Sequence, residues 1–244
     1  ESRHPLMGRI FTAAYYGSFV ALGVFSCQFV YTFIGDVIGT ALKFFPAASA
    51  GFEAYNLPVI CSLTAITVIA GMVQVKGGPY VEMVDVPLKN LPPAFDGFQI
   101  VQISDLHLSP TIRRAYAEKV VHMANELKPD MIVLTGDFID GSVEELREDA
   151  APLAKLSAPH GVWFVTGNHE YYWNAASWVQ EFRRLGIRVL VNEHEVIKKG
   201  EDAIILGGIT DYSTRHWKGP EASDPARAFA GAPSGVPKVL LAHQ

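Results

Sequence analysis

The sequence predicts an α/β domain with a largely parallel β-sheet, preceded by two transmembrane helices. The first 79 of the 244 residues carry only four of the 20 Lys and Arg residues and three of the 25 Asp and Glu residues. The rest of the chain alternates short apolar runs, typical of buried strands, with longer segments of helical periodicity. We therefore expect a membrane segment over residues 1–79 and a globular domain over residues 80–244.

Two uncharged stretches define the expected transmembrane helices, at about residues 10–34 and 57–75. At about 1.5 Å per residue they reach about 37 and 28 Å, which suits a hydrocarbon core of about 30 Å. A signal peptide does not fit the first stretch, because its apolar region has only about 7–15 residues. Two buried helices of a soluble domain are the remaining alternative, although such helices usually carry a polar stripe.

The charges that flank the two stretches predict the orientation in the membrane. Arg3 and Arg9 precede the first stretch and Lys76 follows the second, whereas the connecting segment has no net positive charge. The positive-inside rule therefore places both ends, and the globular domain, in the cytoplasm of a multi-pass membrane protein. The chain begins with Glu1 rather than Met, so additional spans upstream are an open alternative, and an odd number of them would reverse the orientation.

The globular domain is expected to begin with an edge strand and to continue with a regular alternation of strands and helices. The expected strands cover residues 81–88, 98–104, 131–135, 162–166, 187–191, 203–209 and 236–242, and the expected helices cover residues 115–127 and 143–156. The last three strands have less helix between them. They indicate either a second sheet or a mixed continuation of the first.

Polar side chains follow four of the expected strands, at the point where each strand ends. They are Asp105, His107, Asp137, Asn168, His169 and His243. Ligands of open α/β sheets bind at the carboxyl ends of the strands, so we expect these side chains to converge. Taken singly, each has an ordinary interpretation as a turn residue, a helix N-cap or a buried strand-end histidine.

Together, these side chains offer carboxylates, an amide oxygen and imidazoles, without the thiolates of a structural zinc site. This set suits divalent Mn, Fe or Zn. Two neighbouring cations need a bridging carboxylate, and Asp137, at the end of a central strand, is the natural candidate. Three more residues have open interpretations: Glu170 either orients His169 or caps a turn, and Asp211 and His216 either reach the site or lie in a surface turn.

Composition argues against two other kinds of partner. The chain has a formal net charge of −5 and no run of basic residues, so we expect no stable nucleic-acid binding. Cys27 and Cys61, the two cysteines, both lie in the apolar stretches. They form neither a metal-binding pair nor a disulfide framework.

The order and spacing of the strand-end motifs resemble those of the calcineurin-like metallophosphoesterase family, in particular its membrane-attached bacterial branch. The motifs are Asp105-x-His107, Gly136-Asp137, Gly167-Asn168-His169-Glu170 and the final His243. The resemblance implies two mixed β-sheets sandwiched between helices. It also implies a phosphoesterase hydrolase, acting on a phosphodiester or phosphomonoester with a hydroxide activated by a dinuclear metal centre.

The same motif match implies a role for each residue. Asp105 and His107 would hold the first cation, Asn168 and His243 the second, and Asp137 would bridge the two, while His169 would be a catalytic residue facing the phosphate or the leaving group. In the family, a Gly-His-x-His motif follows the last histidine and gives one ligand to each cation. The chain stops at Gln244, so we expect the domain to be C-terminally incomplete.

The substrate stays open at this stage. A membrane segment next to the domain favours a phospholipid-like or otherwise lipid-linked phosphoester, and soluble nucleotides are the alternative within the same class. A catalytically inactive relative that serves as a membrane scaffold is the alternative from a different class.

Overall fold

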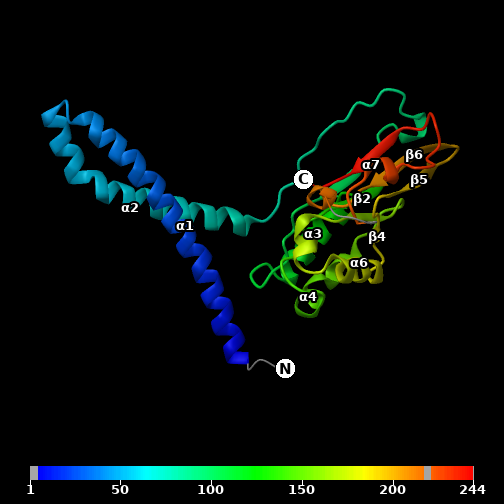
Figure 1. Cartoon of the computed structure of the whole chain (residues 1–244), viewed down its shortest axis with the longest axis horizontal. Helices are drawn as coiled ribbons and strands as arrows, with labels where there is room; N and C mark the ends of the chain where they lie inside the picture. Colours follow the sequence, from blue (N-terminus) through cyan, green and yellow to red (C-terminus); the bar gives the residue numbers. More distant parts are fainter. Residues whose placement is uncertain (1–4, 217–220, 244) are drawn as a thin grey trace. The chain divides into compact units, whose positions relative to one another are not determined.

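The computed structural model describes residues 5–216 and 221–243. The chain divides into two compact units, Glu1–Glu82 and Met83–Gln244, close to the change in composition after residue 79. Figure 1 shows the first unit in blue to cyan and the second from green to red.

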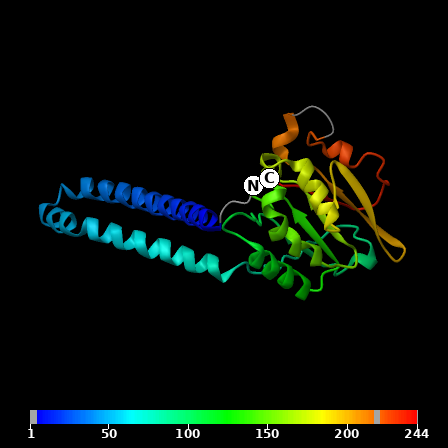
Figure 2. The ribbon, with the colours of Figure 1, turned by 90° about the horizontal axis from the view of Figure 1, so that it is seen from below.

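The first unit is a hairpin of two long helices, α1 (Pro5–Leu42) and α2 (Pro46–Gly77), which run side by side in opposite directions (Figure 2). The segments Ala13–Leu42 and Pro46–Gln74 are long and apolar enough to cross a membrane. Their large apolar side chains are mostly exposed, unlike those of a buried helix in a soluble core. The helices extend beyond the uncharged stretches and include Asp36 and Glu53, since charged residues are compatible with helix formation.

Small and polar side chains hold the hairpin together. The Tyr31 hydroxyl lies 2.8 Å from Thr67 Oγ1 on the facing helix. Gly35 lets α2 approach closely, since a Cβ at this position would lie 2.8 Å from Asn56 Oδ1. Close approach at small residues and polar contacts between helices are typical of membrane helix pairs, where no hydrophobic effect drives association.

The second unit contains two sheets. The first has four strands in the order β1-β2-β3-β4, all parallel: β1 (Ile100–Ile103), β2 (Met131–Thr135), β3 (Val162–Val165) and β4 (Arg188–Val189). The second has the order β5-β6-β7: β5 (Glu193–Lys199), β6 (Asp202–Gly208) and β7 (Lys238–Leu241). In this sheet β6 is antiparallel to β5 and parallel to β7.

Helices and short 3₁₀ turns connect the strands. The helices are α3 (Arg114–Glu126), α4 (Val143–Ala150), α5 (Asn168–Tyr172), α6 (Ala175–Arg184) and α7 (Pro225–Ala228). The 3₁₀ turns are η1 (Pro93–Phe95), η2 (Ala151–Lys155) and η3 (Tyr212–His216). The expected helix over 143–156 changes to 3₁₀ geometry after Ala150 because Pro152 cannot continue the α-helical hydrogen bonds.

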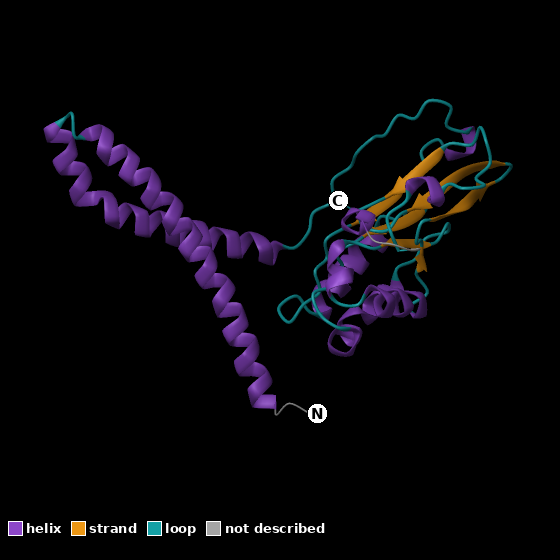
Figure 3. Ribbon diagram, in the orientation of Figure 1, coloured by secondary structure: helices purple, strands orange, loops and turns teal. Residues whose placement is uncertain are grey.

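The parallel sheet is the central layer of the unit. One of its faces packs against α3, α4 and α6 in a cluster that includes Leu134, Phe164 and Phe182. Its other face packs against the second sheet through a cluster that includes Val133 and Leu206. Figure 3 shows the strands in orange, with these helices gathered along one side. The prediction of two sheets among helices is therefore confirmed, although only the second sheet is mixed in the described strands.

Two local expectations were wrong or incomplete. The segment 81–88 forms no strand, since none of the residues that the structure describes pairs with it, and Met83 and Val84 are exposed. Strand β5 and helix α6 were not expected. Strand β5 is mostly charged and buries Ile197 alone, so its sequence lacks the apolar signal of a core strand.

Candidate metal centre

The site lies at the carboxyl ends of the strands. Asp105 and His107 follow β1, Asp137 follows β2, His169 lies in α5 after β3, and His243 follows β7. Backbone hydrogen bonds join the first two of these loops: Asp105 N donates to Gly136 O at 3.1 Å, and His107 N donates to Asp137 O at 3.1 Å. The parallel register of β1 and β2 thus continues into the loops and places their side chains together.

Several site residues have left-handed backbones. The φ angles of Asp105, His107 and Asp137 are 56°, 48° and 56°. Gly136 has a φ of 83°, and a Cβ there would lie 2.9 Å from His243 Cβ. Glycine is therefore required at this position, and the neighbouring left-handed residues turn their side chains toward one another at a cost in backbone energy.

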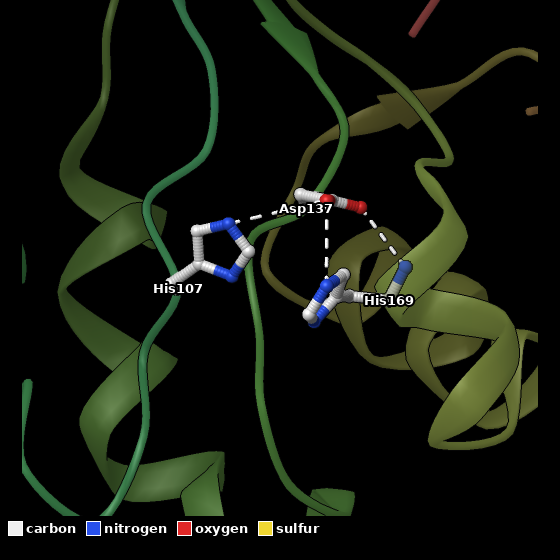
Figure 4. A group of neighbouring side chains, drawn as sticks. All are labelled: His107, Asp137 and His169. Atoms are coloured by element: carbon white, nitrogen blue, oxygen red, sulfur yellow. Dashed lines mark hydrogen bonds and ion pairs between the residues drawn. The ribbon is translucent and has the colours of Figure 1, made fainter. Parts of the chain in front are cut away.

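Five of the expected side chains form two groups that share Asp137. One group is His107, Asp137 and His169, the other is Asp105, Asp137 and His243, and in each group the candidate ligand atoms lie within 4.8 Å of one another. Asp137 Oδ2 lies 3.9 Å from His107 Nε2, 3.8 Å from His169 Nε2 and 3.5 Å from His243 Nε2. Figure 4 shows the first group, with both imidazoles turned toward the carboxylate.

The distances fit divalent cations held between these atoms. Oxygen and nitrogen atoms 3.5–3.9 Å apart are too far for a good direct hydrogen bond. They suit ligands that each approach a shared cation to about 2.0–2.2 Å. Asp137 is 4% exposed, so its charge is largely removed from water and needs a positive partner. The donor set fits a divalent cation on both chemistry and spacing.

The grouping differs from the division implied by the family resemblance. That division pairs Asp105 with His107 and treats His169 as a residue that does not bind metal. In the structure, Asp105 Oδ1 lies 3.8 Å from His107 Nε2 and 3.6 Å from His243 Nε2, so it adjoins both histidines. The assignment of each ligand to a cation therefore stays a prediction.

Asn168 is the expected ligand whose side chain makes no hydrogen bond, among the described residues, to the other five expected site residues. It begins α5, is partly buried, and its Nδ2 donates to the Tyr172 hydroxyl at 3.2 Å. With Nδ2 engaged in this way, Oδ1 is the atom that stays available as a ligand.

Asp140 orients two histidines at once and was not singled out by the sequence. Its Oδ2 lies 3.1 Å from His107 Nδ1, and its Oδ1 makes a hydrogen bond with His169 Nδ1. A carboxylate only accepts, so both Nδ1 atoms carry the proton and both Nε2 atoms are left facing Asp137. The one signal in the sequence was its position three residues after Asp137 in the same loop.

Asp211 contacts His243 at the other side of the site. Its Oδ2 lies 2.9 Å from His243 Nδ1, and both side chains are buried. Burial lowers the pKa of His243, but the hydrogen bond to Asp211 and the negative charges of Asp137, Asp211 and Asp105 outweigh it, so the pKa is raised. Asp211 therefore reaches the site, whereas His216 is exposed and, within the described part of the chain, forms no hydrogen bond or ion pair with the candidate ligands.

Glu170 is fully buried and connects the loop after β2 to the loop after β3, beneath the site. Its carboxylate accepts from the backbone N–H groups of Asp137 at 3.0 Å, Phe138 at 2.8 Å and Gly167 at 2.6 Å. Burial raises the pKa of Glu170, although the three donors oppose the shift. Of the two open interpretations, capping is the one observed, since the Glu170 carboxylate, at the third position of α5, accepts from the N–H of Gly167 at the N-cap position.

Two sheets between helices, with carboxylates and imidazoles at the strand ends, define the protein as a metallophosphoesterase-type domain. Residues 98–236 match the family described as calcineurin-like phosphoesterase. The chain belongs to this family. The structure brings together the family motifs that were recognised in the sequence.

Vertebrate and bacterial relatives agree with this assignment. The chain is 33% identical over 240 residues to "Transmembrane protein with metallophosphoesterase domain" from Danio rerio, covering 93% of the chain and 54% of the relative. The Bos taurus protein of the same name is 36% identical over 191 residues, covering 75% and 43%. An "Uncharacterized metallophosphoesterase" from Helicobacter pylori is 30% identical over 146 residues, covering 60% and 38%. The chain spans about half the length of the first of these curated relatives and less of the others.

Proposed function

We propose that the protein is a membrane-anchored, metal-dependent phosphoesterase that hydrolyses a phosphodiester or a phosphomonoester. The observation that carries this proposal is the buried carboxylate of Asp137, shared by two groups of candidate ligands at the strand ends. Membership of the calcineurin-like phosphoesterase family supports it.

The proposed cofactors are two divalent cations, drawn from Mn, Fe and Zn. Asp105 and His107 would hold one and Asn168 and His243 the other, with Asp137 between them. When bound, such a pair supplies Lewis acidity that activates water and offsets the charge of the phosphate. The bridging position requires a carboxylate that lies close to several ligands, and Asp137 is the residue common to both groups.

His169 is the proposed catalytic residue. Its Nδ1 is held by Asp140, and its Nε2 lies 3.8 Å from Asp137 Oδ2, which supports a place for Nε2 beside the candidate ligands that would bind the phosphate through the cations. A side chain placed there donates a hydrogen bond to a phosphate oxygen or a proton to the leaving oxygen. Asp140 accepts from Nδ1 and so fixes the orientation of the ring. In this role Nε2 donates when the imidazole carries a proton on both nitrogens.

The two long apolar helices supply the membrane anchor in this proposal. The positive-inside rule assigns both ends of the hairpin, and with them the phosphoesterase domain, to the cytoplasmic side. A lipid-linked phosphoester is the proposed substrate class. Residues 78–99 connect α2 to β1, so the domain and the helices belong to one continuous chain, and a lipid-linked substrate would share their membrane.

The test is hydrolysis of bis-p-nitrophenyl phosphate and p-nitrophenyl phosphate by the full-length protein in detergent, with and without Mn²⁺. We expect Mn²⁺-dependent turnover that Asp137→Asn abolishes. Asp85→Asn removes an exposed carboxylate outside the site and is the matched control. His169→Ala is expected to slow alkyl esters more than nitrophenyl esters, since a poor leaving group depends more on a proton donor.

Other outcomes would redirect the proposal. A folded protein that binds no Mn²⁺ and cleaves neither ester would favour an inactive membrane scaffold. Turnover of nitrophenyl esters without turnover of phospholipids in mixed micelles would remove the lipid-linked substrate and keep the phosphoesterase. Protease protection of the domain in sealed vesicles of known orientation tests the cytoplasmic side.

A further inference from the structure

Asp211 forms a buried pair with His243 that the proposed chemistry does not yet use. The Asp211 side chain is 4% exposed, the His243 side chain is 9% exposed, and Oδ2 lies 2.9 Å from Nδ1. A contact of this length between a carboxylate and an imidazole is a charge-assisted hydrogen bond in a region shielded from water. The inference drawn from it rests on the proposed function, in which His243 is a metal ligand.

The pair determines which nitrogen of His243 faces the candidate metal centre. Asp211 only accepts hydrogen bonds, so Nδ1 carries the proton and Nε2 keeps its lone pair. Nε2 lies 3.5 Å from Asp137 Oδ2 and 3.6 Å from Asp105 Oδ1. The lone pair is therefore directed to the space that these carboxylates share. A ligating histidine needs this tautomer, and a carboxylate on its other nitrogen also makes it a stronger donor.

Asp211 is itself held in place by its own loop. Ser213 N donates to Asp211 Oδ1 at 2.7 Å, which leaves Oδ2 for His243. The Thr214 hydroxyl donates to Asp211 O at 2.8 Å and accepts from Ser223 N at 3.1 Å. Thr214 and Asp211 are both buried, so these connected hydrogen bonds hold the Asp211 carboxylate in one position.

Asp211 and Asp140 support different histidines from different sheets. Asp140 lies in the loop after β2 of the parallel sheet and contacts His107 and His169. Asp211 lies three residues after β6 of the second sheet and contacts His243. The two groups that share Asp137 therefore each have their own orienting carboxylate.

We propose that Asp211 is a positioning residue for one of the two cations, acting through His243, and that Asp140 serves the other group independently. Loss of an outer carboxylate on a ligating histidine typically lowers metal affinity by about 10–100-fold. The proposal predicts a loss of this size in one binding step, while the other step is unchanged.

The experiment is a calorimetric titration of the metal-free, full-length protein with Mn²⁺, comparing wild type, Asp211→Asn and Asp149→Asn. Asp149 is a matched control because it is another buried aspartate with charge-assisted contacts, to Arg113 and to the N-terminus of α3, and it lies outside the site. We expect one weakened step in Asp211→Asn and two unchanged steps in Asp149→Asn. A folded Asp211→Asn that binds Mn²⁺ as wild type does, or an equal loss in both variants, would overturn the proposal.

A second measurement does not depend on whether the variant folds. Nitrogen NMR of histidine-labelled wild type, without metal and at a pH where His243 is neutral, should show Nδ1 protonated and Nε2 unprotonated. The opposite tautomer would overturn the proposal even if Mn²⁺ binds normally. Wild-type protein that shows the expected tautomer but binds no Mn²⁺ would overturn the proposed function, and the positioning role with it. The two failures are thus distinguishable.

Discussion

Replacing Glu170 by Gln should destabilise the phosphoesterase domain by loosening the loops under the site. The carboxylate accepts three backbone hydrogen bonds, two at Oε2 and one at Oε1. Gln has an NH₂ group in place of one carboxylate oxygen. That group faces a backbone N–H, which is also a donor, so no hydrogen bond forms between them. The least costly orientation places the NH₂ group opposite Phe138 N, because the remaining oxygen then keeps the other two bonds.

The size of the effect follows from this count. One charge-assisted hydrogen bond is lost, about 1.5–3 kcal/mol, and one buried N–H is left without an acceptor, about 1–3 kcal/mol. Burial raises the pKa of Glu170, because the ionised carboxylate loses its solvation by water. The neutral amide of Gln avoids part of this desolvation cost, which offsets part of the loss. We therefore expect a net loss of about 2–4 kcal/mol, which most domains of about 5–15 kcal/mol stability survive.

Urea unfolding of the full chain in detergent measures this loss through the fluorescence of Trp163 and Trp178, which are both buried in the domain. The matched control is Glu118→Gln. Glu118 is an exposed residue paired with Arg114, and the expected change is about 0.5 kcal/mol or less. A loss in Glu170→Gln no larger than that of the control would refute the reasoning, because it would show that the three contacts do not hold the loops together.

Three further predictions concern the site, the pH dependence of stability and the hairpin. Asp140→Asn should lower turnover about 10–100-fold without changing the melting temperature, and unchanged ester hydrolysis would contradict its orienting role. Hydrogen bonds from Arg184 lower the pKa of Glu181 below its usual 4.5, so its contribution to stability is complete above that value and is lost as the pH falls through the lowered pKa. Urea unfolding at a series of acidic pH values should therefore show a shallower decline in Glu181→Gln, and an identical decline would argue against the shift. Gly35→Leu should lower the thermal stability of the hairpin in detergent, since a Cβ there lies 2.8 Å from a side-chain oxygen of α2, whereas Gly51→Leu, with no atom within 4 Å, should not.

The sequence predicted the convergence of the main site residues because it depends on topology. Apolar runs at regular intervals predict parallel strands, and neighbouring parallel strands end at one edge, so Asp105 and Asp137, which follow β1 and β2, had to meet. His243 follows β7 of the second sheet, and its place in the site depends on how the two sheets pack. Asp140 could not be found in this way. Its position depends on the path of a loop with left-handed residues, and no periodicity encodes that path.

The incorrect expectations share a physical cause. Whether an apolar segment becomes a strand depends on a neighbour that offers backbone hydrogen bonds, and the pattern over 81–88 carries no information about that neighbour. Strand β5 shows the converse. It forms because β6 supplies seven paired positions beside it, even though its own residues are mostly charged.

The left-handed backbones of Asp105, His107 and Asp137 have a consequence for how this domain can be altered. Each such residue costs roughly 1–2 kcal/mol relative to a relaxed conformation, and glycine would remove most of that cost. Selection for thermostability alone would therefore favour glycine at all three positions and erase the ligands. Any stabilised variant of this protein has to be screened for metal binding as well as for melting temperature, because at these positions the two properties oppose each other.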